Sequence, residues 1–130
     1  MTEAKRRILA ARAMSDVGAA QCAGVVQLAD ERHVFTELTR TGGLTVDELA
    51  KACNLPVRLA SSILTALAAS GYVDFDSGTK KYSLGPEQQS LFANENDPLF
   101  VGGAFQLVRG LARNDPAEIE AGISRSSRAA

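Results

Sequence analysis

Residues 44–84 constrain the fold more than any other part of the sequence, because each expected element there has its own start or stop signal. Thr45 and Glu48 have the spacing of a capping box, in which each side chain binds the other residue's backbone amide at a helix start. Asn54 tolerates the left-handed turn that ends such a helix, and Pro56 suits the first turn of the next one. The segment therefore predicts two short helices joined by a tight turn.

A β-hairpin is expected directly after the second of these helices. Gly71 ends the helix, and residues 72–75 then have the alternation that is typical of a strand. Residues 76–79 are a turn sequence, and residues 81–84 supply the second strand. Helix, tight turn, helix and hairpin, in this order, make up a winged helix-turn-helix. We therefore predict a mainly α fold with a two-stranded wing and extra helices at both ends.

The whole chain divides into four expected parts: an N-terminal helix (1–14), the winged helix-turn-helix core (15–84), a post-wing helical extension (85–123) and a disordered polar tail (124–130). Within the core, Ser15 and Asp16 are predicted to cap a new helix. In the extension, Asp97 is predicted to cap a strongly apolar helix over residues 98–113. That helix has no clean polar face, so we expect it to be buried on more than one side.

Several stretches resemble one known family. They are residues 44–48, 69–73 and 82–84, followed by Pro86-Glu87-Gln88 and Gly103-Ala104-Phe105-Gln106. Together they are similar to the N-terminal winged-helix domain of bacterial class I S-adenosylmethionine-dependent methyltransferases, over residues 15–112. The resemblance implies a domain that dimerises through its N-terminal helices. It also implies that the domain covers the active site of a Rossmann-like catalytic domain, which lies in the same chain or in a separate one.

The sequence has no residues that would bind the methyltransferase cofactor. A Rossmann-like domain places a glycine-rich loop after its first strand, so that backbone amides approach the ligand. This chain has 11 glycines but no Gly-x-Gly spacing, and its only paired glycines, Gly42-Gly43 and Gly102-Gly103, do not follow a strand in a βαβ unit. We therefore assign no catalytic, cofactor-binding or metal-binding residue. The expected role is a non-catalytic dimerisation and substrate-cover module, either free-standing or part of a longer enzyme.

A homodimer is expected because the helices that flank the winged helix carry more apolar side chains than one small domain can bury. The small residues between positions 18 and 24 would let another helix approach closely. Two-fold symmetry is the commonest way to close such a contact. The predicted interface residues are Val17, Ala20, Ala23, Val26, Phe100, Phe105 and Val108.

A small DNA-binding transcriptional regulator is the alternative function, because the same fold is used to read DNA. The expected contacts are Arg58, Ser61, Ser62 and Thr65 on the second helix, with Lys80 and Lys81 on the wing. DNA binding depends largely on cations that neutralise phosphates. The chain has 14 Lys and Arg against 15 Asp and Glu, and the helix-turn-helix itself is neutral. The charge balance thus makes DNA a disfavoured partner.

The remaining polar residues indicate no chemistry of their own. Cys22 and Cys53 lack further ligands at metal-binding spacing, so we interpret them as small buried side chains in a reducing compartment. His33 has no evident catalytic partner and is expected to be structural. Glu87 and Asp97 fit either helix capping or the lining of a substrate cleft. No run of about 20 apolar residues is present, so we expect a cytoplasmic protein without a membrane partner.

Overall fold

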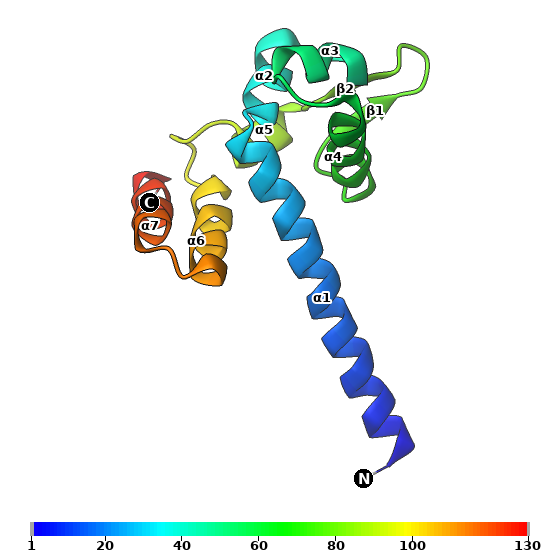
Figure 1. The fold of residues 1–130 in the computed structure, drawn as a ribbon, viewed down its shortest axis with the longest axis vertical. Coiled ribbons are helices and arrows are strands. Elements are labelled where there is room, and N and C mark those ends of the chain that lie inside the picture. The colour runs from blue at the N-terminus through cyan, green and yellow to red at the C-terminus, as the bar shows by residue number, and fades with distance from the viewer. Residues whose placement is uncertain (1, 130) are drawn as a thin grey trace.

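A computed structural model describes residues 2–129, and its order of elements is the one that the winged-helix pattern predicts. The elements are α1 (Glu3–Glu31), α2 (Val34–Thr41), α3 (Val46–Ala52), α4 (Val57–Ala69), β1 (Asp74–Asp76), β2 (Lys81–Ser83), α5 (Pro86–Phe92), α6 (Gly102–Arg113) and α7 (Pro116–Ala129). Helices α2 to α5 and the hairpin gather at one end of the long α1, while α6 and α7 lie to one side of it (Figure 1). The fold is mainly α, as predicted.

The local signals around the helix-turn-helix are confirmed. The Thr45 hydroxyl accepts a hydrogen bond from the Glu48 amide (3.3 Å), and the Glu48 carboxylate accepts one from the Thr45 amide (2.9 Å). Asn54 has a φ of 53° and Gly71 a φ of 78°, so both occupy the left-handed turns that separate α3 from α4 and α4 from the wing. The sequence therefore specifies this region through short-range contacts.

The wing is a short antiparallel hairpin in which Phe75 pairs with Tyr82. Leu44, just before α3, forms a β-bridge to Tyr82 through two backbone hydrogen bonds of 2.9 and 2.8 Å. This bridge fixes the wing against the start of the helix-turn-helix, so the wing cannot pivot freely about Gly71.

The hydrophobic core lies among α1, α2, α3, α4 and α5. Its most completely buried large side chains are Val26, Val34, Leu38, Leu49, Leu64 and Leu67. Phe35 and Phe92 stack with ring centroids 5.0 Å apart, which attaches α5 to α2. We call residues 22–92 the body: the last part of α1, the helix-turn-helix, the wing and α5.

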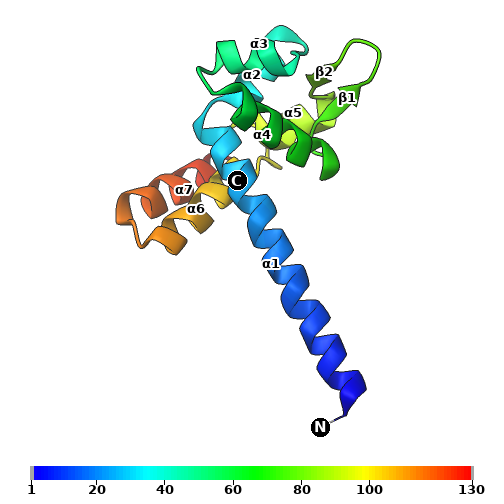
Figure 2. The ribbon, with the colours of Figure 1, turned by 45° about the vertical axis from the view of Figure 1, so that its right-hand side comes forward.

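Helix α1 differs from the prediction, because the expected break at Ser15 is absent. A single helix of 29 residues runs through Ser15 and Asp16, and the N-terminal cap is Thr2, whose side chain accepts from the Lys5 amide. Alanines on both sides, at positions 10, 11 and 13 and again at 19 and 20, favour a helix, and it continues through the weaker helix formers Asp16, Val17 and Gly18 between them. The first two-thirds of α1 projects away from the body (Figure 2).

The segment before α6 also differs from the prediction, since the helix begins at Gly102 instead of residue 98. Asp97 caps a tight turn: its side chain accepts from the Leu99 amide (2.9 Å) and its carbonyl accepts from the Phe100 amide (3.0 Å). Residues 93–101 therefore form a loop that connects the body to α6.

Helix α7 occupies most of the segment that was expected to be a disordered tail at 124–130. The helix extends to Ala129, and Ala130 lies outside the described residues. Asp115 starts it by accepting from the Ala117 amide (3.1 Å), and Arg125 fixes its far end through ion pairs. Polar composition alone indicated disorder, but these long-range pairs order the segment.

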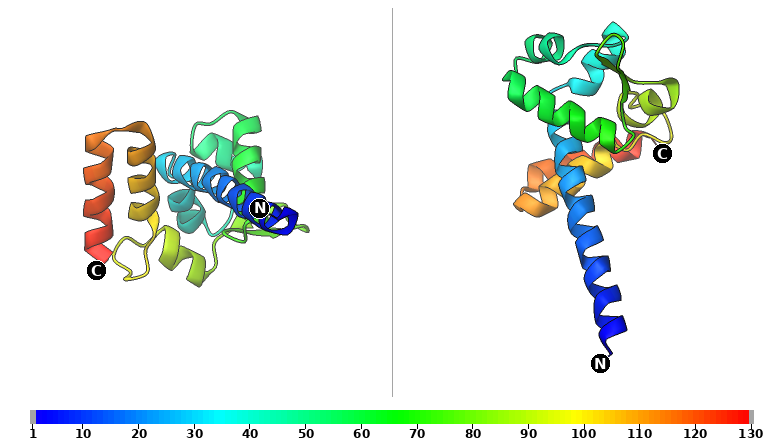
Figure 3. Two further views of the ribbon diagram at one scale, coloured as in Figure 1. Left: turned by 90° about the horizontal axis from the view of Figure 1, so that it is seen from below. Right: turned by 90° about the vertical axis from the view of Figure 1, so that its right-hand side faces the viewer.

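Helices α6 and α7 form a close antiparallel pair, which we call the arm (residues 102–129; Figure 3). Glycines face the neighbouring helix at three points of closest approach. A Cβ added at Gly103 would lie 2.6 Å from the Ser126 amide nitrogen, and one added at Gly110 would lie 2.7 Å from the Ile119 nitrogen. Gly103 therefore serves close packing within this chain.

Candidate functional site

The N-terminal part of α1 presents apolar side chains that the other described residues leave exposed. Ile8, Leu9 and Met14 are 71%, 68% and 67% exposed, and every residue from 3 to 20 is exposed. These side chains do not form one narrow stripe, because positions 8 and 9 lie about 100° apart around a helix. Helices that are apolar on several sides are normally buried. This surface is therefore a candidate site for contact with another polypeptide.

A shallow apolar groove continues this surface where α1 meets α6. It has a volume of about 220 Å³ and is lined by Ala23, Ala104, Phe105 and Val108. Val108 and Leu111 remain at least half exposed at its edge. The exposed part of α1 and the groove are thus two apolar surfaces that both lie on α1.

The structure places the predicted interface residues in three settings. Val17 and Ala20 are exposed on the projecting part of α1, and Ala23, Phe105 and Val108 line the groove, whereas Val26 and Phe100 are buried within the chain itself. Sequence reasoning assigned all seven residues to one interface, and the structure places five of them on the projecting helix or in the groove. It could not identify Val26 and Phe100 as buried, because a sequence does not show which apolar side chains the chain's own core will cover.

The predicted DNA-contacting residues lie on one face of the helix-turn-helix. Arg58, Ser62 and Thr65 are exposed along one side of α4, Ser61 is half-buried, and Lys80 and Lys81 are exposed on the wing. The Ser62 hydroxyl donates to the Arg58 carbonyl (3.0 Å), and Lys80 Nζ lies 6.0 Å from the centre of the Phe75 ring. Arg58 is the only cation on α4, which leaves few groups for phosphate contacts.

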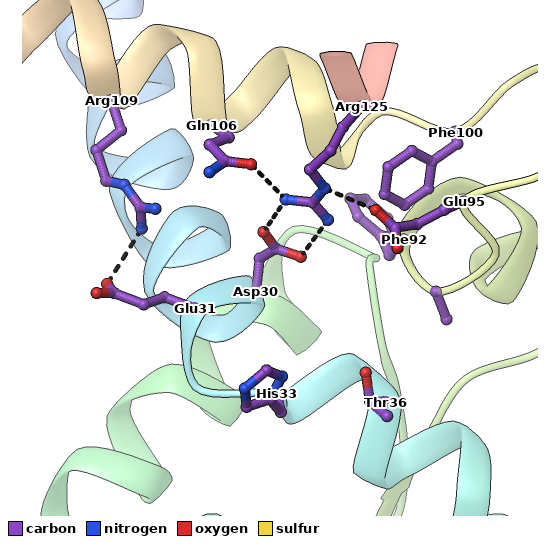
Figure 4. Close-up of a pocket in the computed structure, with 11 residues that line it drawn as sticks. Asp30, Glu31, His33, Thr36, Phe92, Glu95, Phe100, Gln106, Arg109 and Arg125 are labelled. Atoms are coloured by element: carbon purple, nitrogen blue, oxygen red, sulfur yellow. Dashed lines mark hydrogen bonds and ion pairs between the residues drawn. The ribbon is translucent and has the colours of Figure 1, made fainter. Parts of the chain in front are cut away.

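Two arginines that the sequence analysis did not single out join the arm to the end of α1 (Figure 4). Arg125 of α7 binds both carboxylate oxygens of Asp30 (2.7 and 3.1 Å) and also donates to Glu95 (2.7 Å) and Gln106 (2.7 Å). The hydrogen bonds to Asp30 are the main reason that the pKa of Arg125 is raised, although burial opposes the change. Arg125 thus stays charged and bound to three other segments.

Arg109 of α6 makes a second connection next to the first. It is only 9% exposed, and it donates to Glu118 within the arm, to Glu31 at the end of α1 (3.1 Å) and to the Gln27 carbonyl (3.4 Å). The hydrogen bonds from Arg109 lower the pKa of Glu118. A nearly buried cation requires such partners, because an unpaired charge in a protein interior is very costly.

A cavity of about 400 Å³ lies between these arginines and the body, and His33 and Thr36 form its floor in Figure 4. Among the described residues, every buried side-chain nitrogen or oxygen has a hydrogen-bond partner. The charged groups around the cavity therefore satisfy one another. No local sequence signal could have revealed them, because Arg125 and Asp30 are 95 residues apart and Arg125 fell in the expected tail.

The remaining polar residues considered in the sequence lie in turns, at a helix start or partly buried between helices. His33 forms the left-handed turn between α1 and α2 (φ 63°), and Glu87 is exposed in the first turn of α5. Cys22 lies 3.3 Å from the Ser70 hydroxyl, and burial raises the pKa of the Cys53 thiol. Both cysteines are half-buried free thiols.

Among the described residues, no single helix has the length and apolar content to cross a membrane. Helices α3 and α4, which meet at 115°, pass that test only when they are taken together as a bent pair.

Comparison with known proteins establishes the fold. No family model and no curated protein matches the sequence. The solved structures that match include PigF with SAH (21% identity, TM-score 0.62), the mitomycin 7-O-methyltransferase MmcR (14%, 0.70) and CalO1, a methyltransferase in calicheamicin biosynthesis in its SAH-bound form (16%, 0.65). The matches cover 88%, 98% and 99% of this chain but only 34%, 46% and 45% of those chains. The chain therefore has the fold of a part of these proteins, and it spans less than half of their length.

Proposed function

We propose that this chain is a non-catalytic winged-helix module of methyltransferase type, which dimerises and covers the substrate of a catalytic domain. The catalytic domain would lie in the same chain or in a separate one. The match to methyltransferase structures supports the proposal, since it covers almost all of this chain and less than half of each of theirs. So does the sequence, which lacks the glycine-rich loop that the cofactor requires.

The observation that carries the dimerisation part is the uncovered state of α1. Every residue from 3 to 20 is exposed in the described part of the chain, which leaves the apolar side chains of this segment in water unless a partner covers them. A second copy of the chain is the partner that we propose, because it presents the same projecting helix and the same groove. A two-fold arrangement lets each copy cover the other's apolar face with a single type of contact.

Measuring the oligomeric state tests this part directly. We expect the 13.7 kDa chain to sediment as a dimer. Val17→Glu should weaken the dimer by about 3 kcal/mol, or roughly a hundredfold in Kd, because it places a charge in an apolar contact. Val57→Glu is the matched control: Val57 is 52% exposed, against 47% for Val17, but lies on α4 outside the proposed contact. A folded wild-type monomer at high micromolar concentration would contradict the proposal.

Calorimetry with S-adenosylmethionine tests the non-catalytic part. We expect no binding to this chain alone, and micromolar affinity would mean that a cofactor site exists here after all.

The alternative of a DNA-binding regulator has one favourable observation, the exposed row of Arg58, Ser62 and Thr65 on α4. It requires submicromolar, strongly salt-dependent binding to duplex DNA, which Arg58→Ala should abolish. Weak binding that Arg58→Ala leaves unchanged would leave the dimerisation module as the better description.

A further inference from the structure

The contact between the arm and the body is partly open to solvent. Solvent-accessible pockets of about 400, 180 and 220 Å³ border the region where α6 approaches the last turns of α1. Water can therefore enter between the arm and the body without any change in the packing of the core.

Apolar contact across this region is limited. Phe105 of α6 lies against Phe92 of the body, with ring centroids 6.4 Å apart. The other well-defined connections are the polar ones, in which Arg125 binds Asp30 and Arg109 binds Glu31. The covalent link is the loop of residues 93–101, whose regular structure is confined to turns.

Packing inside the arm is of the opposite kind. At Gly103, Gly110 and Gly122 the two helices approach so closely that an added Cβ would fall within 2.7 Å of a backbone nitrogen of the other helix. A pair of helices in such close contact moves together or not at all.

From this contrast we propose that the arm is a movable unit that swings about residues 93–101, and that Arg109 and Arg125 form an ionic latch that closes it onto the end of α1. The proposal goes beyond the dimerisation and cover function, because the latch lies within one chain and would operate in a monomer or a dimer.

The distribution of partners makes such opening feasible. Arg109 keeps Glu118, and Arg125 keeps Gln106, because these partners belong to the arm itself. The groups left behind are Asp30 and Glu31, which border the 400 Å³ cavity and become hydrated when it widens. Arg109 therefore keeps an ion pair, whereas Arg125 keeps only an uncharged partner and becomes hydrated, because it too lines the pocket that widens. Neither arginine is then a buried charge without partners, the situation that makes breaking most buried ion pairs so costly.

A distance measurement within one chain tests the latch. Spin labels at Lys51 on α3 and Ala117 on α7, both exposed positions, would report the separation of body and arm. The background is Cys22→Ser/Cys53→Ala, and an excess of unlabelled protein suppresses distances between chains. We expect a narrow distance distribution for the intact latch and a broad one, shifted to longer distances, for Asp30→Asn/Glu31→Gln.

The matched control is Glu37→Gln, which removes the same kind of carboxylate from an arginine pair, Glu37 with Arg40, inside the body. It should leave the distribution narrow. An unchanged distribution in Asp30→Asn/Glu31→Gln, with native helix content by circular dichroism, would overturn the proposal. If the double variant loses helix content, the single variant Glu31→Gln decides. The Glu31 carboxylate is half-exposed, so the fold tolerates this change. A broadened distance distribution in Glu31→Gln supports the latch, and an unchanged distribution refutes it.

Discussion

The body and the arm contact are stabilised in different ways. In the body, side chains such as Leu38, Leu49 and Leu64 are completely enclosed, and burial of apolar surface, which is non-directional, provides the stability. Where the arm meets the body, two arginines supply the well-defined connections and cavities remain between the helices. Ion pairs depend on the position and charge of a few atoms. One chain thus combines a region that unfolds only as a whole with a region that can be released separately.

The largest expected effect comes from the body. Leu64→Ala removes an inaccessible side chain of α4 and should lower the free energy of unfolding by about 2–5 kcal/mol, as the change leaves a cavity that the core fills poorly. Urea denaturation followed by circular dichroism measures this. Leu111→Ala, at a position that is 62% exposed on the arm, should change the stability by less than about 0.5 kcal/mol. Equal effects at the two sites would remove the distinction between body and arm.

A smaller effect is expected from the glycine contacts within the arm. Gly110→Ala places a Cβ 2.7 Å from a backbone nitrogen, which has little freedom to move, so we expect a loss of about 1–3 kcal/mol, confined to the arm. Gly24→Ala is the control: this glycine is also inside a helix, but nothing lies within 4 Å of its added Cβ. There the better helix propensity of alanine should stabilise the protein by about 0.5–1 kcal/mol. Hydrogen exchange assigns each effect to its helix, and a stabilising Gly110→Ala would show that the arm helices are loosely packed.

The smallest effect is a dependence on pH. Hydrogen bonds from Arg109 hold the pKa of Glu118 below its ordinary value of 4.5. A carboxylate whose pKa is lower in the folded state stabilises that state above its unfolded pKa, and the contribution disappears as the pH falls through the folded pKa. We therefore expect the amide signals of the arm to weaken below about pH 4.5 in NMR spectra. Glu118→Gln should remove this dependence. Hydrogen bonds with Thr45 also lower the pKa of Glu48, so acid weakens the capping box of α3 as well. The amide signals of the body must therefore be followed separately from those of the arm.

The sequence predicted the elements that depend on neighbouring residues. The capping box of Thr45 and Glu48, the left-handed turns at Asn54 and Gly71, and the hairpin that follows were all correct, because the partners lie within a few residues of one another. The break at Ser15 was wrong for a related reason. Serine is favoured at helix starts, but the alanine-rich segments on both sides favour a continuous helix, and the preference of one residue is small beside theirs.

The arrangement of the arm could not be predicted, because it depends on contacts between distant residues. Asp30 and Arg125 become neighbours only once α6 and α7 have folded back along α1. Gly103 illustrates the same point: its position in the sequence indicates close approach to some helix, but only the structure shows that this helix is α7 of the same chain. For the same reason the sequence could not separate Val26 and Phe100, which the core buries, from the exposed Val17.

The position of α1 at the start of the chain has a consequence for the order of assembly. The ribosome completes α1 before α2, α4 and α6, the later helices that pack against it, so its apolar residues emerge into water without a partner. The body can form once residue 92 has emerged, whereas the bond between Asp30 and Arg125 must close a loop of 95 residues and comes last. The exposed section around Ile8 remains uncovered even then. In the proposed dimer its burial is a second-order step, so that proposal predicts a yield of assembled protein that rises with the local concentration of newly made chains.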